Sequence, residues 1–155
     1  MKASEILYRV ATDADLPGIT RVRTSVAENH LTVAEMAQRG ITEATVARSF
    51  RGRSRGWVAE HDGHIVAFAI ADRETHAIFA LFVQPGFDGR GIGSQLLNLA
   101  VDWLWDSGTQ RIWLTTRHGT KAANFYQRRG WVATATDASG NIRYELERPV
   151  GRNAA

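Results

Sequence analysis

The sequence contains no cysteine, which excludes disulfide bonds, thiolate metal sites and cysteine nucleophiles together. It also lacks any apolar run of the roughly 20 residues that a bilayer-spanning helix needs. Its first residues, MKASEILYRVATDAD, alternate polar and apolar side chains without the apolar core of a signal peptide. These absences predict a cytoplasmic protein with no membrane partner.

The sequence also has no large excess of charge of one sign. It contains 19 lysines and arginines and 16 acidic residues, which gives a net charge of +3. Arginine dominates the basic side and raises the isoelectric point to about 9.8. The one dense basic cluster is RGRSRG, with Arg51, Arg53 and Arg55 between glycines. It could be a solvated loop or contact phosphate or nucleic acid, but the interleaved aromatics of a nucleic-acid-binding module are absent. We therefore expect no nucleic-acid partner.

The length of 155 residues, of which 44% are hydrophobic, predicts a single domain over residues 1–155 with a frayed tail at 149–155. The first half predicts a strand at 6–11, a helix capped by Asp13, one or two short helices between 26 and 50, and two strands joined by an Asp62-Gly63 hairpin turn.

The second half predicts an almost wholly apolar strand at 76–83, covered on both faces, and a helix that ends near Gly108. After it we expect a strand at 111–116, a helix opened by Thr120, and strands at 131–136 and 142–146. The order β-α-α-β-β-β-α-β-α-β-β is that of an α/β domain with a mixed sheet.

A glycine-rich segment, QPGFDGRGIGS (residues 84–94, the glycine loop), separates the apolar strand from the next helix. A strand, a glycine turn and a helix start in that order form an anion site, because free N–H groups and the helix dipole both favour negative charge. The phosphate-binding loop of proteins that cleave nucleoside triphosphates ends in glycine, lysine and then serine or threonine. Here Ser94 follows Gly93 directly, without the lysine, so this pattern is not matched. The alternating glycines at 89, 91 and 93 do not match the dinucleotide pattern either.

The segment LFVQPGFDGRGIGSQLL resembles the acetyl-coenzyme A loop of the GNAT superfamily of N-acetyltransferases, matched at Val83, Pro85, Gly91 and Gly93. The segment TKAANFYQRRGW is similar to the second signature of that family, matched at Ala122, Phe125, Tyr126, Gly130 and Trp131. The resemblance covers residues 6 to 147 and implies a mixed, mostly antiparallel central sheet flanked by helices. It also implies transfer of an acetyl group from acetyl-coenzyme A to a primary amine of a small molecule, protein or peptide, without a metal.

The resemblance assigns coenzyme binding to residues at the end of the strand, along the glycine loop and on the later helix: Leu81, Phe82, Val83, Asp88, Gly89, Arg90, Gly91, Ile92, Gly93, Ser94, Thr120 and Tyr126. Two positions depart from the family. Asp88 stands where arginine or glutamine is usual, and would repel a phosphate unless it points outward, against Arg90. Gly119 stands where asparagine is frequent, so Thr120 could supply that contact.

The resemblance makes Tyr126 the general acid, with a core tyrosine as the alternative interpretation. The base is open, because the strand at 76–83 lacks the carboxylate that the family often uses. His76 and Glu74 at its start and Glu28 and His30 in the early helical region are the candidates, and each could instead be a surface residue. Glu28 could also attract a cationic acceptor amine.

Two other interpretations remain open. Asp88 and the missing base would suit a catalytically weak acyl-coenzyme A-binding or regulatory domain on the same fold. Trp103 and Trp105 flank the apolar face of the helix after the glycine loop, which indicates either a homodimer surface or partial burial at a helix edge.

Overall fold

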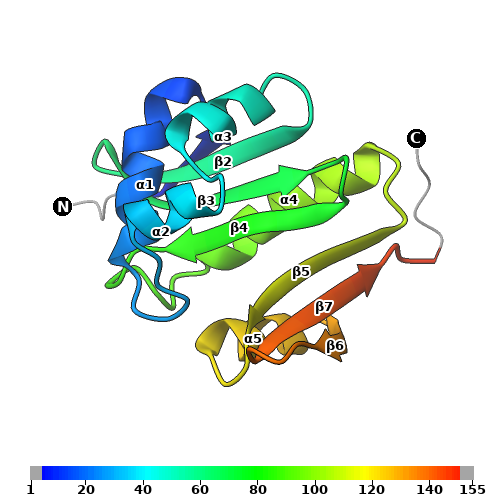
Figure 1. The fold of residues 1–155 in the computed structure, drawn as a ribbon. Helices are drawn as coiled ribbons and strands as arrows, with labels where there is room; N and C mark the ends of the chain where they lie inside the picture. Colours follow the sequence, from blue (N-terminus) through cyan, green and yellow to red (C-terminus); the bar gives the residue numbers. More distant parts are fainter. Residues whose placement is uncertain (1–4, 151–155) are drawn as a thin grey trace.

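The computed structural model describes residues 5–150, so most of the predicted tail, 151–155, lies outside the described residues. The strands are β1 (Leu7–Val10), β2 (Ser54–His61), β3 (His64–Asp72), β4 (Ala77–Val83), β5 (Arg111–Arg117), β6 (Val132–Thr136) and β7 (Asn141–Glu147). They form one seven-stranded sheet in the order β1-β2-β3-β4-β5-β7-β6 (Figure 1). All neighbouring pairs are antiparallel except β4 and β5, which confirms the mixed, mostly antiparallel sheet.

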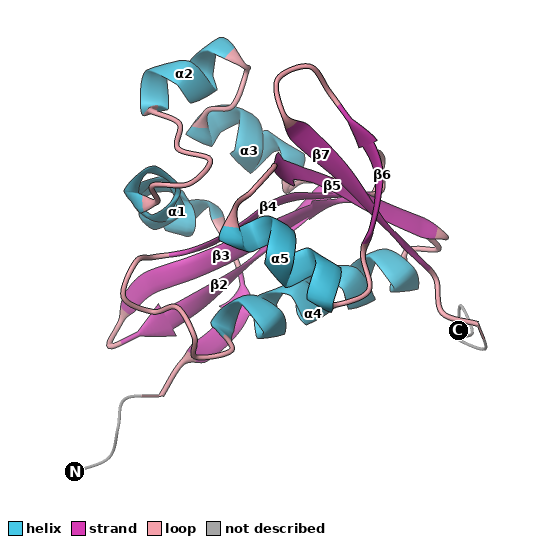
Figure 2. Ribbon diagram, turned by 90° about the horizontal axis from the view of Figure 1, so that it is seen from below, coloured by secondary structure: helices cyan, strands magenta, loops and turns pink. Residues whose placement is uncertain are grey.

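Helices cover both faces of this sheet. The helices α1 (Leu16–Ser25), α2 (Val33–Gln38) and α3 (Glu43–Ser49) lie on one face, and α4 (Ile92–Asp106) and α5 (Lys121–Arg128) lie on the other (Figure 2). The apolar face of α4 buries Leu96, Leu97, Ala100 and Leu104 against the sheet, as its helical spacing predicts. A smaller cluster on the opposite face packs α1 against β2 and β3.

The early helices begin differently from the prediction. Asp13 does not cap a helix; it lies in a 3₁₀ turn (Asp13–Asp15) and forms an ion pair with Arg51. Asp15 precedes α1 instead, and its carboxylate accepts hydrogen bonds from Thr12 N and from the Arg9 guanidinium, which together lower its pKa. Region 26–50 forms two helices, so three α-helices precede β2 rather than the two in the expected order.

The hairpin prediction is confirmed, because β2 ends at His61, β3 starts at His64 and Asp62-Gly63 forms the turn between them. Elsewhere the boundaries agree with the apolar patterns to within a few residues. Thr120 caps α5 as predicted, since its hydroxyl accepts a hydrogen bond from Ala123 N at 3.2 Å.

Strands β4 and β5 are paired only where β4 begins. The register joins Ala77 to Trp113, and the adjacent hydrogen bond runs from Trp113 N to His76 O at 3.1 Å. Past Ala77 the two strands separate, as Figure 1 shows, so the edge of β4 that faces β5 has no strand partner in the described structure. We call this region the split.

The start of the split coincides with a β-bulge in β4. Ile70 pairs with Ala80 and Ala71 with Ile78, which leaves Phe79 as the extra residue. The expectation that this strand is covered on both faces is therefore wrong at Phe79, whose side chain remains 47% exposed. An apolar sequence does not reveal a bulge, because the bulge depends on the register with β3.

The arginines of RGRSRG do not form one basic face. Arg51 pairs with Asp13, Arg53 pairs with Asp72 at 2.8 Å, and Arg55 lies over the ring of Trp103 at 5.5 Å. Trp103 also packs edge-on against Trp57, whereas Trp105 is buried in the core. The structure thus gives Trp103 partners within the chain, and a homodimer surface stays a prediction.

Candidate active site

The glycine loop joins the end of β4 to the start of α4. Gly91 is the residue before the first turn of α4, and its backbone has φ of +78°, a left-handed conformation that glycine adopts without a steric penalty. Within the described residues no side chain caps this end of α4. The free N–H groups of the first turn and the positive end of the dipole of a 15-residue helix therefore face outward beside the split.

Asp88 lies on the outside of the glycine loop. It is exposed and makes no ion pair or hydrogen bond in the part of the chain that the structure describes. The expected contact with Arg90 is not formed, because the Arg90 guanidinium lies over the Phe87 ring at 4.9 Å. The acidic side chain is therefore surrounded by solvent, which screens its charge.

Helix α5 borders the glycine loop from the side of β5. A Cβ built on Gly93 would lie 3.8 Å from the Phe125 ring and 3.7 Å from Val83, so the side chains of α5 and β4 meet at this point. Arg129, just after α5, lies over the Phe125 ring at 3.7 Å and donates a hydrogen bond to Ser94 Oγ. Sequence reasoning missed Arg129 as a site residue, although its place at the end of the second signature was a usable signal.

Thr120 and Gly119 open α5. The Thr120 hydroxyl donates to Arg117 O at 2.9 Å and accepts from Ala123 N, so its single proton is already used. Toward a ligand it could only accept a hydrogen bond. Gly119 has φ of +77°, a conformation that asparagine also tolerates, so the asparagine that the resemblance led us to expect would fit this backbone, but glycine offers no side-chain amide.

Tyr126 is the buried aromatic residue of α5. It is 6% exposed and packs edge-on against Trp131 with ring centroids 5.7 Å apart. Its hydroxyl has no hydrogen-bond partner among residues 5–150. The hydroxyl oxygen is nevertheless not fully buried. Buried tyrosine hydroxyls normally find a partner. This one is free to donate to a ligand, and burial raises its pKa above the ordinary 10.0.

The α1–α2 loop (residues 26–32) connects the two sides of the split. Glu28 Oε2 accepts a hydrogen bond from Lys121 N at 2.9 Å, at the start of α5. Asn29 donates to Thr116 Oγ1 and accepts from Arg117 N, both at 3.3 Å, at the end of β5. Asn29 was not a sequence candidate, since nothing in a single asparagine indicates contacts 87 and 88 residues away.

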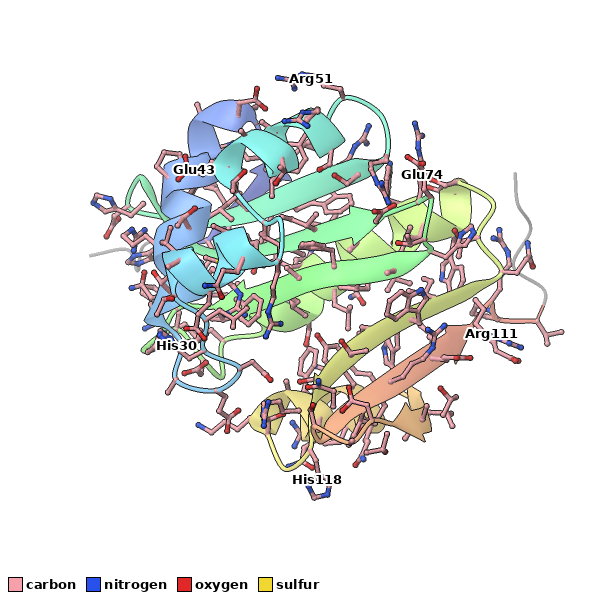
Figure 3. The ribbon with its side chains drawn as sticks, in the orientation of Figure 1. His30, Glu43, Arg51, Glu74, Arg111 and His118 are labelled. Carbon is pink, nitrogen blue, oxygen red and sulfur yellow. The ribbon has the colours of Figure 1, made fainter. Side chains whose placement is uncertain are left out.

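The candidate bases lie at opposite ends of β4. His76 and Glu74 precede its first residue, and His76 Nδ1 is 3.0 Å from Thr109 Oγ1, beyond the C-terminal end of α4. His30 lies at the other end, as Figure 3 shows for His30 and Glu74. Glu28 caps α5. The structure therefore brings Phe125, Gly93 and the end of β4 together, with Tyr126 packed against Phe125, but it does not bring His76 to the glycine loop.

A cavity of about 430 Å³ opens on the opposite face of the sheet, between α3 and the sheet. Its floor includes Ile70 and Phe79, so it reaches the bulge where the split begins. The α2–α3 turn and α3 form its rim and wall, with Arg39 and Arg48 among them. Sequence reasoning selected none of these four residues.

The sequence model of the acetyltransferase (GNAT) family matches residues 24–131, most of the chain and both signatures. The chain belongs to this family. It is 34% identical over 85 residues to an uncharacterized N-acetyltransferase, MJ1207, from Methanocaldococcus jannaschii. That alignment covers 48% of this chain and 38% of the relative, so the chain spans well under half the length of the curated relative it matches.

Solved structures share the fold at low identity. A PaiA N-acetyltransferase from Thermoplasma acidophilum, in complex with coenzyme A, has a TM-score of 0.75 at 15% identity over 93% of this chain and 99% of its own. An N-acetyltransferase from Staphylococcus aureus Mu50 has a TM-score of 0.76 at 20% identity, with the same coverage. The ribosomal-protein-S18-alanine N-acetyltransferase from Escherichia coli has a TM-score of 0.71 at 19% identity over 96% of this chain and 99% of its own.

Among residues 5–150 no group of three or more histidine, aspartate or glutamate side chains could hold a metal ion. In the same range no helix has both the length and the apolar character needed to cross a membrane.

Proposed function

We propose that this chain is an N-acetyltransferase that uses acetyl-coenzyme A as its co-substrate and acetylates a primary amine. One observation carries the proposal. The unpaired edge of β4 and the uncapped start of α4 meet beside Phe125 of α5. The next residue, Tyr126, has a hydroxyl without a hydrogen-bond partner among residues 5–150. The family supports this use of the site, and the neighbour from Thermoplasma acidophilum contains coenzyme A.

The residues present fit that co-substrate. The N–H groups that start α4 suit a pyrophosphate, and Arg129 beside Ser94 adds a cation to the same place. Leu81, Phe82 and Val83 carry the unpaired edge of β4, whose backbone groups could hydrogen-bond an extended amide-containing arm. The Thr120 hydroxyl could only accept a hydrogen bond from the co-substrate, because its proton is donated to Arg117 O.

Bound acetyl-coenzyme A would supply a thioester whose acetyl carbon an amine can attack. Tyr126 would donate its proton to the departing sulfur, because a phenol with a raised pKa stays protonated at neutral pH. Backbone groups of β4 at the bulge would polarise the acetyl carbonyl. The acceptor would enter from the opposite face, since the 430 Å³ cavity reaches the bulge at Phe79.

The proton of the acceptor amine needs a different carrier. Glu28 and His76 stay candidates, but neither lines the cavity, and Glu28 already accepts the Lys121 N–H. Water in the open cavity is the simplest carrier, because the nitrogen of the attacking amine becomes positively charged when the carbon–nitrogen bond forms and then releases one proton readily.

The test of the proposal is a calorimetric titration with acetyl-coenzyme A, followed by an amine panel in which free coenzyme A thiol is measured. Micromolar binding and amine-dependent thiol release would support an acetyltransferase. Binding without release by any amine would favour the acyl-coenzyme A-binding or regulatory domain. Failure to bind would refute both.

We expect Asp88→Asn to strengthen acetyl-coenzyme A binding by about threefold at low ionic strength, because it removes an exposed negative charge beside the phosphate site. Titrations at low and high salt measure the effect, and the gain should shrink as salt screens the charge. The control is Glu74→Gln, an exposed acid at the far end of β4. A gain equal in both variants would contradict a local repulsion at the glycine loop.

We expect Glu28→Gln to keep most of the activity and Glu28→Ala to lower the free energy of unfolding by about 1 kcal/mol. The amide oxygen of glutamine can still accept the Lys121 N–H, whereas alanine leaves that end of α5 without it. Steady-state rates as a function of pH, together with urea unfolding, measure the two effects. A loss of kcat above tenfold in Glu28→Gln would identify Glu28 as the base instead.

A further inference from the structure

We infer that the acceptor is an amine that also carries an oxyanion, a carboxylate or a phosphate, and that the cavity between α3 and the sheet binds this group. We call this cavity the arginine cavity; three of its lining residues are Arg39, Arg48 and Arg53. The inference rests on the proposed function, because it takes the cavity as the acceptor's route to the thioester.

The arginine cavity lies next to the point at which acetyl transfer would take place. Phe79 lines the cavity and is also the bulged residue at which β4 and β5 begin to separate. A second cavity of similar volume lies beside the β2–β3 hairpin and the start of the glycine loop, away from the bulge. Of these two cavities, the arginine cavity is the one that reaches the point where an acetyl carbonyl would meet the bulge.

The charge balance of the arginine cavity is positive. Arg53 is neutralised by Asp72, at 2.8 Å, and the other oxygen of Asp72 accepts the backbone N–H groups of Glu74 and Thr75. Arg39 and Arg48 make no ion pair and no side-chain hydrogen bond with any residue from 5 to 150. Both side chains are exposed, so an incoming oxyanion would find two arginines that lack a bound acid.

Nearby acids offset part of this charge, but none of them forms an ion pair with Arg39 or Arg48 within residues 5–150. Glu35, one turn before Arg39, lies within its electrostatic reach, but its carboxylate accepts the N–H of Thr32 at 3.1 Å. Glu43, at the start of α3, accepts a hydrogen bond from Thr20 Oγ1 at 3.2 Å. Figure 3 shows Glu43 at the outer end of α3, on the side of α1.

Arg23, on α1, adds to the positive field. Its guanidinium lies over the Phe82 ring at 4.1 Å and donates to Asn29 O at 2.9 Å, while its Nη1 is fully buried without a partner. Burial lowers its pKa, and the charge of Arg39 lowers it further. No described carboxylate forms an ion pair with Arg23, so Arg23, Arg39 and Arg48 are three arginines near β4 without a paired acid in residues 5–150.

The remaining lining sets the shape of the acceptor. Ile41, Val46, Ile70 and Phe79 give the cavity an apolar interior. The cavity extends from Phe79 on β4 to Ser54 on β2, two strand spacings of about 4.8 Å, or roughly 10 Å. Arg39 and Arg48 lie in the α2–α3 turn and on α3, across the cavity from Phe79 on the sheet. An apolar arm would therefore separate an amine at the bulge from an oxyanion at these arginines.

The experiment compares 6-aminohexanoate with 6-aminohexanamide, which differ only in the carboxylate, and includes 6-aminohexyl phosphate. Binding is followed by protein-detected NMR titration without acetyl-coenzyme A, and acetylation by thiol release. The proteins are the unaltered chain, the double variant Arg39→Gln/Arg48→Gln, and Arg51→Gln. Arg51 is the control, because it is paired with Asp13 at the outer edge of the molecule and does not line the cavity (Figure 3).

We expect the carboxylate or the phosphate to bind at least tenfold more tightly than the amide, with shifts at cavity residues. The double variant should lose this preference, and Arg51→Gln should keep it. Whichever oxyanion binds more tightly identifies the group. Equal binding of the amide, no binding of any probe, or a preference that survives in the double variant would overturn the inference. If the unaltered chain does not bind acetyl-coenzyme A, the proposed function is refuted instead. The NMR titration would still show whether the cavity binds the oxyanion.

Discussion

Gly91→Glu is expected to abolish measurable acetyl-coenzyme A binding, a loss of about 100-fold or more. The new carboxylate would stand at the start of α4, where the phosphates are expected. At about 5 Å and an effective dielectric constant of about 20, two like charges repel by roughly 3 kcal/mol, which corresponds to more than two orders of magnitude in affinity. Isothermal titration calorimetry measures the change directly.

Two controls separate the causes of that loss. Gly52→Glu introduces the same acid at an open position where the backbone has no positive φ, and it should bind acetyl-coenzyme A normally. Gly91→Ala adds the strain of a side chain at φ +78° without the charge, which costs roughly 1–2 kcal/mol, so it should lower the melting temperature by a few degrees. Normal binding by Gly91→Glu would mean that the phosphates do not lie at the start of α4.

Tyr126→Phe is expected to lower kcat by about 10²- to 10⁴-fold and to leave acetyl-coenzyme A affinity nearly unchanged. The ring keeps its packing against Trp131, and only a hydroxyl without a protein partner is lost. Steady-state kinetics with an amine found in the panel, together with calorimetry, separate kcat from binding. An unchanged kcat would show that Tyr126 is a core residue.

The matched control for this variant is Tyr144→Phe. Tyr144 is fully buried beside Tyr126, with ring centroids 6.3 Å apart, and its hydroxyl accepts a hydrogen bond from Gln127 Nε2 at 3.0 Å. Its removal should cost about 1 kcal/mol of stability and little activity. Tyr126→Phe should therefore lose catalysis, whereas Tyr144→Phe should lose stability.

Stability at high pH gives a second measurement on Tyr126. Its pKa is raised from 10.0 in the folded state by burial, so above about pH 10 the unfolded chain loses a proton that the folded chain retains. The unfolded state then binds fewer protons, and the free energy of unfolding falls as pH rises, by at most about 1.4 kcal/mol per pH unit. Tyr126→Phe lacks this group, so the difference in stability between the two proteins should change above pH 10 and stay constant below it.

The sequence determined the local features by itself. The Asp62-Gly63 hairpin and the Thr120 cap depend on residues close together in the chain, and the structure confirms both. The glycine loop followed from the same kind of pattern, because a strand, alternating glycines and a helix start are contiguous in sequence. The second signature placed Tyr126 on a helix that begins after Thr120 for the same reason.

Only the tertiary structure decided where the sheet opens and what surrounds the opening. The bulge at Phe79 depends on the register between β3 and β4, and the split depends on where β5 leaves β4. Asn29 reaches β5 across 87 residues of sequence, and the arginine cavity is assembled from α3, the α2–α3 turn and three strands. These are long-range pairings of ordinary residues, so no periodicity or spacing in the chain could predict them. They also shape the acceptor side, which is why the sequence predicted the coenzyme loop and not the acceptor.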